Sequence, residues 1–339
     1  MKKIFTVFLT IILSLSLFGC NSAKQEEVTP NQQIETIEIT DQVGRTVTFD
    51  KPVEKIVSTY YLVSASLLTL GLKDKIVGIE MKAKSRGLYN LAAKELIDLP
   101  AVGSGKEINI EAIASLEPDV VFLPKKQKDA ADTLEELGIP SIVVNPESYD
   151  QFNELISIIG KVCGVSDKAD ELINYYENTV SNISSAVANA EKPTVYIAGE
   201  SSYLRTCAGD MYQKQMIDIC GGECVSAALE GSSWVDISKE QLLEFNPDYI
   251  FVVNYAEYSL DDLKNDESLK DLKAIQNNNV YMIPSKIEAW DYPQPSSILG
   301  LYWMAGILHP DIIAEDAYLN EAISFYNKYY DIQVGNEDF

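Results

Sequence analysis

The chain has 339 residues, and its 51 acidic residues outnumber its 27 lysines and arginines, which gives a net charge of −24 at pH 7. Nucleic acid and anionic lipid are poor partners for such a surface, because their phosphates repel it. The length exceeds the usual size of a single hydrophobic core, so two lobes are expected.

The first twenty residues have the composition of a bacterial export signal. Two lysines precede an uncharged, mostly apolar run, Ile4–Phe18, which is short for a membrane span. The run ends in Leu-Phe-Gly-Cys at Cys20, which resembles the lipobox of bacterial lipoproteins. We therefore expect a signal peptide at 1–19, lipid modification of Cys20 and a flexible tether at 20–37. A signal peptide without lipidation is the alternative.

Each half of the folded chain opens on a short apolar strand that leads into a polar loop and a helix. These strands are expected at Lys55–Ser58 and at Thr194–Ala198. The alternation of strands and helices that follows predicts a mainly parallel sheet in each half.

One helix-to-strand unit occurs twice. Residues Ile110–Phe122 (IEAIASLEPDVVF) align without gaps on Lys239–Phe251 (KEQLLEFNPDYIF), 129 residues further along. In each copy an amphipathic helix is stopped by Pro-Asp, because the residue before proline disfavours the helical region. The apolar run that follows is typical of a buried parallel strand. Two copies this far apart indicate two similar lobes rather than a solenoid.

A long helix is expected between the lobes. Asp167–Ala190 carries apolar residues at a helical period, and one helix is a stiffer connector than two or three crossing strands, so lobe motion should be small. The expected fold is α/β, with two Rossmann-like lobes of mainly parallel sheets joined by one long backbone helix. Its divisions are an N-terminal lobe at 38–148, a connecting helical segment at 149–191 and a C-terminal lobe at 192–339.

The cysteines and the single histidine form no common zinc pattern. Three residues rather than two separate Cys220 from Cys224, and no histidine is near them. With Cys207 they allow either a disulfide in an oxidising compartment or buried free thiols. His309 is expected at the C-terminal end of a helix. We predict no metal site, and a bare transition metal is a poor ligand because receptors for such metals use several histidines.

Ligands of parallel α/β lobes lie in the crevice beyond the carboxyl ends of the strands. The loops at these ends combine aromatic residues with a few cations, which suits a bulky anion, because rings supply stacking area and arginine grips carboxylate or catecholate oxygens. Trp234 and Trp290, each flanked by polar residues, are the strongest aromatic candidates. The predicted ligand-binding residues are Tyr60, Tyr61, Met81, Arg86, Lys125, Tyr203, Arg205, Trp234, Trp290 and Tyr292.

Four segments carry a resemblance to a known family. They are Ile39–Val47 with Pro52, Val53–Val57, Asn109–Asp119 and Leu137–Pro140. Together they resemble the class III substrate-binding proteins of bacterial ABC importers, which serve ferric siderophores, haem and cobalamin. The resemblance implies that Glu111 and Glu240, at the equivalent position of the two repeats, pair with arginines on the two permease subunits. Two like charges related by pseudo-symmetry also suit a two-subunit partner on physical grounds.

The resemblance implies an extracytoplasmic, monomeric solute-binding lipoprotein, anchored to the bacterial cell membrane through the lipid on Cys20. Between its lobes it would capture an iron chelate, a ferric siderophore first, and deliver it to an ABC permease dimer with its ATPase, without a cofactor. Haem, cobalamin or another corrinoid, and a molybdate-type oxyanion are alternative ligands, and a surface adhesion or structural lipoprotein is the alternative class. An enzyme is not expected, because the sequence has no G-x-S-x-G or H-E-x-x-H motif.

Overall fold

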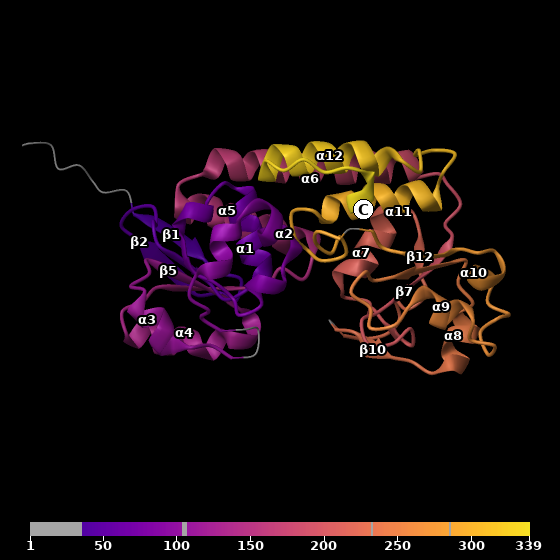
Figure 1. Ribbon diagram of the computed structural model, residues 1–339, viewed down its shortest axis with the longest axis horizontal. Helices are drawn as coiled ribbons and strands as arrows, with labels where there is room; N and C mark the ends of the chain where they lie inside the picture. Colours follow the sequence, from indigo (N-terminus) through magenta and orange to yellow (C-terminus); the bar gives the residue numbers. More distant parts are fainter. Residues whose placement is uncertain (1–35, 104–106, 232, 285) are drawn as a thin grey trace, which may run out of the picture. The chain divides into compact units, whose positions relative to one another are not determined.

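The computed structural model describes residues 36–103, 107–231, 233–284 and 286–339, which form helices, two larger sheets and a two-stranded hairpin (Figure 1). The predicted signal peptide and Cys20 lie outside the described residues. Within the described part, no helix is both long and apolar enough to cross a membrane.

The first sheet has four parallel strands in the order β4-β3-β5-β6. β3 (Ile56–Ser58), β5 (Val120–Pro124) and β6 (Ser141–Val144) are buried along their whole length, and β4 (Ile76–Gly78) is an edge strand. Their mostly apolar, valine-rich and isoleucine-rich sequences suit this place, because helices cover both faces of a parallel sheet. An antiparallel hairpin of β1 (Ile37–Thr40) and β2 (Thr46–Phe49) precedes the sheet.

The helices of the first lobe are α1 (Tyr61–Thr69), α2 (Gly87–Ala92), α3 (Ile110–Ser115) and α4 (Lys128–Glu136). All residues of α1 are buried, in keeping with its apolar and small side chains. α4 is amphipathic and buries Ala131 and Leu134. Short 3-10 turns in the described part of the chain are η1 (Lys73–Lys75), η2 (Ala83–Ser85), η3 (Lys94–Asp98), η4 (Lys125–Gln127) and η5 (Asn336–Asp338).

The second sheet has six strands, of which five follow the order β10-β8-β7-β11-β12 and β9 pairs with β7. The pairs among β7, β9, β11 and β12 are parallel, whereas β8 pairs antiparallel with both β7 and β10. The strands are β7 (Thr194–Ala198), β8 (Arg205–Thr206), β9 (Glu223–Cys224), β10 (Val235–Asp236), β11 (Tyr249–Val252) and β12 (Val280–Met282). The helices of this lobe are α7 (Tyr212–Ile219), α8 (Lys239–Phe245), α9 (Leu260–Lys264) and α10 (Lys273–Gln276).

The predicted repeat is confirmed, since α3 leads into β5 as α8 leads into β11. The residue before each proline, Glu117 or Asn246, adopts the left-handed conformation, with φ of 47° or 39°. Asp119 then accepts hydrogen bonds from the backbone N–H groups of Glu54 and Lys55 at 2.7 and 2.9 Å. The equivalent Asp248 accepts one from the backbone N–H of Thr194 at 2.9 Å. Each aspartate thus fastens its turn to the first strand of its own lobe.

Two helices, α5 (Tyr149–Cys163) and α6 (Ser166–Val187), lie between the last strand of the first sheet and the first strand of the second. Gly164, with φ of 73°, ends α5 in a left-handed cap and allows the sharp turn into α6. The predicted long helix is therefore present as α6. It ends three residues earlier than predicted, and α5 packs along it as a second helix of the connecting segment.

The C-terminal helices are α11 (Ser297–Leu308) and α12 (Ala317–Tyr330), and α12 touches both lobes. α12 packs on α6, as Figure 1 shows, with the rings of Tyr175 and Phe325 6.4 Å apart. It reaches α1 of the first lobe through a 2.9 Å hydrogen bond between Tyr330 Oη and Thr69 Oγ1. The main cluster of buried apolar residues accordingly has members in both lobes.

Candidate ligand-binding site

Arg86 is a partly exposed cation in the loop that follows β4, at the carboxyl edge of the first sheet. Its Cζ atom lies 3.9 Å from the centroid of the Tyr61 ring, and its Nε atom lies 3.9 Å from Glu80 Oε1. Nε has no hydrogen-bond partner among the described residues, and 31% of the side chain is exposed. Ring stacking thus holds the guanidinium in place and leaves its exposed donors available to an anion.

Glu80 is the buried acid beside this arginine. Its Oε1 accepts a hydrogen bond from Tyr89 Oη at 2.8 Å, and its Oε2 accepts one from Ser64 Oγ at 3.0 Å. Burial raises the pKa of Glu80, while the hydrogen bond from Tyr89 and the charge of Arg86 counteract that rise. At 3.9 Å the ion pair is loose, in contrast to a bidentate arginine–carboxylate pair.

Two contacts hold the surroundings of Arg86 against the second lobe, one from α1 and one from Gly87. Tyr61 Oη donates a hydrogen bond to Glu288 Oε2 at 3.2 Å, and burial raises the pKa of Glu288 to about 7. Gly87 approaches the second lobe so closely that a Cβ atom there would lie 2.5 Å from the carbonyl oxygen of Ile287. Because Tyr61 also carries the Arg86 guanidinium, the second lobe helps to position this arginine.

Tyr255 and Tyr292 supply a stacked aromatic pair from the second lobe, with ring centroids 5.0 Å apart and planes at 14°. Tyr255 Oη donates a 2.8 Å hydrogen bond to Asp291, a fully buried acid whose pKa burial raises to about 6. Burial raises the pKa of Tyr292, and the charge of Arg86 lowers it. Tyr292 and Arg86 therefore lie within electrostatic reach of each other across the lobes.

Tyr60 and the lysines after β5 extend this group on the first lobe. Burial raises the pKa of Tyr60, and the charges of Glu147 and Tyr292 raise it further. Glu147 has its own pKa raised by burial and lowered by the exposed Lys126 and Lys125. The structure therefore gathers half of the predicted ligand residues into one neighbourhood, namely Tyr60, Tyr61, Arg86, Lys125 and Tyr292.

The prediction that Trp290 faces the ligand is wrong. Its side chain is fully buried, and its Nε1–H donates a 3.1 Å hydrogen bond to Tyr326 Oη. Its ring lies against Phe339, with centroids 5.3 Å apart. The polar neighbour that suggested exposure, Asp291, is itself buried. Trp290 is a core residue of the second lobe.

Tyr203 and Arg205 lie around β8, apart from the contacts just described. Tyr203 Oη donates a 2.8 Å hydrogen bond to Asp266, which also pairs with Lys239 at 2.6 Å. Arg205 lies 3.7 Å from Asp236 across the β8–β10 pair. No contact with Arg86 is present for either residue among the described ones, and their ligand role stays a prediction.

Trp234 and Met81 occupy two further places. The Trp234 ring covers the end of β7, where a Cβ atom on Gly199 would lie 2.7 Å from ring atom Cε3. Met81 is 63% exposed and lines a hollow of about 550 Å³ together with the start of α3. Met81 thus lies at the α3 side of the loop, and both residues remain predicted ligand contacts.

Glu111 and Glu240 are both exposed, and each is the second residue of its helix. Asn109 caps α3 and Ser238 caps α8, each through a side-chain oxygen that accepts a backbone hydrogen bond. Glu111 lines the hollow that contains Met81. The two glutamates are therefore equivalent in local structure, and their pairing with a permease remains a prediction.

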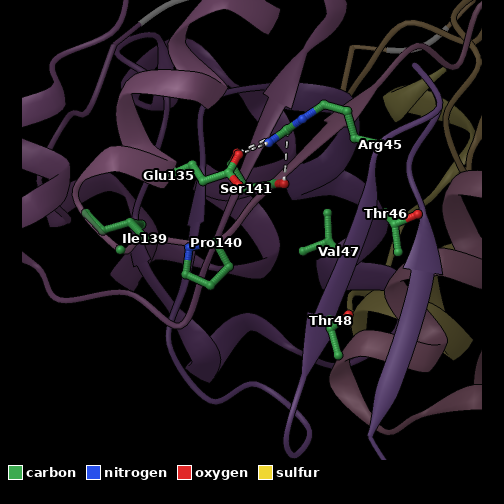
Figure 2. Close-up of a pocket in the computed structure, with 9 residues that line it drawn as sticks. Arg45, Thr46, Val47, Thr48, Glu135, Ile139, Pro140 and Ser141 are labelled. Atoms are coloured by element: carbon green, nitrogen blue, oxygen red, sulfur yellow. Dashed lines mark hydrogen bonds and ion pairs between the residues drawn. The ribbon is translucent and has the colours of Figure 1, made fainter.

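A smaller hollow, about 220 Å³, lies between the β1–β2 hairpin and the turn from α4 to β6 (Figure 2). Arg45 lies over it and reaches Glu135 Oε2 at 3.3 Å and Ser141 Oγ at 3.4 Å. Because an acid already pairs with this arginine, the hollow lacks the open cation that characterises the Arg86 neighbourhood, and we assign it no ligand.

Cys163, Cys207, Cys220 and Cys224 are buried free thiols in this structure. Cys207 Sγ lies 4.0 Å from Cys224 Sγ. His309 is buried directly after α11, as expected for a residue at a helix end. Within the part that the structure describes, no group of three His, Cys, Asp or Glu side chains could hold a metal ion.

Sequence reasoning missed the buried acids Glu80, Glu288 and Asp291. Glu80 stands between Ile79 and Met81. Glu288 follows Ile287, and Asp291 follows Trp290. Acidic residues embedded among apolar ones in strand-end loops were the available signal, because an acid in such a setting is buried only where partners exist.

A family model described as periplasmic binding protein matches residues 56–287. The chain is 25% identical to an uncharacterised ABC transporter substrate-binding lipoprotein of Bacillus subtilis, covering 93% of this chain and 100% of that protein. It is 25% identical to the molybdate-binding protein MolA of Haemophilus influenzae (86% and 90% covered) and 23% identical to the Fe(3+)-citrate-binding protein YfmC of B. subtilis (83% and 89% covered). A solved periplasmic solute binding protein from Veillonella parvula is similar with a TM-score of 0.77 and 26% identity, covering 89% of this chain and 95% of that one.

Proposed function

The chain belongs to the periplasmic binding protein family, and we propose that its ligand is an anionic iron chelate, a ferric siderophore first. Its relatives are substrate-binding proteins of ABC importers rather than enzymes, so the general role is to bind a small ligand and deliver it to a permease. The identity of the ligand depends on the chemistry of the groups around Arg86.

The observation that carries the proposal is the open guanidinium of Arg86. Its Cζ atom lies over the Tyr61 ring, its ion pair with Glu80 is loose, and 31% of the side chain is exposed. A cation held in this way recognises an anionic group without first breaking a strong ion pair. The ligand should therefore carry an anionic oxygen at this point.

Aromatic surface on both lobes favours a chelate over a small inorganic anion. Tyr60 lies on the first lobe, and the stacked rings of Tyr255 and Tyr292 lie on the second. Such faces gain affinity from a bulky organic ligand, because buried ring area and stacking both contribute. The exposed Lys125 adds positive charge at the rim.

A molybdate-type oxyanion is the second candidate. The relative from H. influenzae is named as a molybdate-binding protein, and a single open arginine also suits a compact tetrahedral anion. Such a small anion gains no stacking energy from the tyrosine rings, and we therefore place it second.

The membrane and permease contacts belong to the same proposal. Lipid on Cys20 would tether the protein, in keeping with a relative that is named as a lipoprotein. Glu111 and Glu240 would dock on the two permease subunits, and their equivalent, exposed positions at the starts of α3 and α8 support this role.

Fluorescence titration separates the candidates, with the partly exposed Trp234 as reporter. The probes are ferric citrate, a ferric tris-catecholate, haem, cobalamin and molybdate. We expect a ferric chelate to bind most tightly and Arg86→Gln to weaken it about thirtyfold, the effect of losing an anchor that contributes about 2 kcal/mol. Arg45→Gln is the matched control and should bind like wild type, since Arg45 pairs with Glu135 and lines a different hollow. Preferred binding of molybdate would favour the second candidate, and unchanged affinity in Arg86→Gln would refute the site.

A further inference from the structure

We infer that Glu80 is an internal counter-anion for Arg86, which an anionic ligand replaces while Glu80 takes up a proton from solvent. This inference rests on the proposed function, because it requires an anion at Arg86. In this role Glu80 makes the site favour anionic ligands, although Glu80 does not contact the ligand.

The geometry supports this exchange because the two groups are held by different partners. Tyr89 and Ser64 hold both oxygens of the Glu80 carboxylate, at 2.8 and 3.0 Å. Tyr61 supports the guanidinium of Arg86. The Glu80 carboxylate therefore stays in place when Arg86 binds a ligand anion, and only the 3.9 Å ion pair between the two residues is weakened.

Once Arg86 has bound a ligand anion, a negative charge on the buried Glu80 carboxylate is unfavourable. Glu80 is only 3% exposed, and Arg86 is the cation that counteracts the effect of burial on its pKa. A ligand anion on Arg86 offsets that cation, so the pKa of Glu80 rises further and the carboxylate binds a proton. The only bond that forms on the protein is the O–H bond of the protonated carboxyl group, whose proton comes from solvent, and the ligand oxygen takes the place of Glu80 as the anion nearest Arg86.

The other groups that face Glu80 do not supply a competing charge at neutral pH. Ser64 faces it from α1 and Tyr89 from α2, and the Tyr61 ring lies against the Tyr89 ring with centroids 5.8 Å apart. Burial raises the pKa of Tyr61 and of Tyr89, so both phenols stay neutral. On the second lobe the acid Glu288 accepts a hydrogen bond from Tyr61 at 3.2 Å.

Linkage fixes the sign of the effect. Protonation of Glu80 removes the competing anion, so affinity for an anionic ligand rises as pH falls through the titration of Glu80 and declines as pH rises. Reciprocity gives the size: a ligand that raises this pKa by one unit binds tenfold more tightly to the protonated form.

Calorimetry on the full chain tests the inference with ferric citrate and molybdate as probes. Titrations at pH 6 to 8 in PIPES and in Tris, buffers with different ionisation enthalpies, give the number of protons taken up per ligand bound. We expect wild type to take up a substantial fraction of a proton more than Glu80→Gln, whose affinity should also depend less on pH and be up to tenfold tighter at pH 7.5. Protons that the ligand itself exchanges cancel in this difference.

Two further variants complete the design. Tyr89→Phe removes a hydrogen bond that favours the Glu80 carboxylate, so the pH at which affinity falls should move upward. Glu95→Gln, which removes an exposed acid paired with Lys73 on the same lobe, should match wild type. If Glu80→Gln does not fold, the pH dependence of ligand affinity is compared between wild type and Tyr89→Phe. The same pH dependence in both proteins would overturn the inference.

The outcomes separate this inference from the proposed function. If neither probe binds wild type at any pH, the anion site at Arg86 is wrong and the inference is overturned with it. If a probe binds with the same proton uptake and pH dependence in wild type and Glu80→Gln, only the role of Glu80 is overturned.

Discussion

Replacement of Trp290 by alanine gives a direct test of where the core of the second lobe ends. The indole is fully buried, donates a hydrogen bond to Tyr326 and lies against Phe339. Truncation of a tryptophan in a packed interior costs about 3–5 kcal/mol, because the transfer free energy is lost and a cavity remains. Tyr326 also bonds to Glu288, so the loss of the indole donor adds little to this cost.

The assay is thermal unfolding without ligand, followed by ligand titration of the folded variant. A loss of 3–5 kcal/mol corresponds to a decrease of about 10 °C in Tm for a chain of this size. Trp303→Ala, at another core position that is 6% exposed, should lose a similar amount, whereas Trp234→Ala, at a partly exposed position, should lose about 1 kcal/mol. A Trp290→Ala variant that melts like wild type but binds more than tenfold more weakly would refute the core assignment.

Three other perturbations follow from the structure. Glu111→Lys with Glu240→Lys should abolish uptake in cells and leave ligand affinity within about twofold, because both residues are exposed at helix starts; an equal loss of affinity would contradict the docking role. Gly87→Ala should cost about 1–3 kcal/mol in unfolding experiments, since its Cβ would lie 2.5 Å from the Ile287 carbonyl oxygen, and an unchanged Tm would show that the lobes part easily. Burial raises the pKa of Glu288 to about 7, so the folded state binds this proton more tightly than the unfolded chain and the stabilisation is lost as pH rises toward 7. Glu288→Gln should therefore be more stable than wild type at pH 8, by on the order of 3 kcal/mol, and equal to it at pH 4. Equal stability at both pH values would show that folding does not raise the pKa of Glu288.

Local sequence signals were sufficient for the framework of the fold. The repeat at Ile110–Phe122 and Lys239–Phe251 predicted both helix-to-strand units, because Pro-Asp and the apolar run after it act over a few residues. The apolar period of 167–190 likewise predicted α6. The second connecting helix, α5, and the return of α12 to the first lobe depend on tertiary packing, which periodicity does not report.

The candidate site was predicted less well, because its chemistry depends on partners distant in sequence. Arg86 and Tyr61 could be nominated from their positions after strands, but the contact of Tyr61 with Glu288 joins residues 227 positions apart. Trp290 was misassigned because Asp291 beside it suggested solvent, whereas Asp291 is buried with bonds from Tyr255 and Gln213. A charged residue in a loop does not reveal from sequence whether it meets water or a buried donor.

The hydrogen bond between Thr69 and Tyr330 has a consequence for the order of folding. These residues are 261 positions apart, and α1 packs on α12. Contacts of such large sequence separation close late, because the chain must first lose much of its conformational entropy. In a chain that emerges from its N-terminus, the apolar surface of α1 that faces α12 stays uncovered until the last helix arrives. We therefore expect the first lobe to complete its packing only after the last helix has been synthesised.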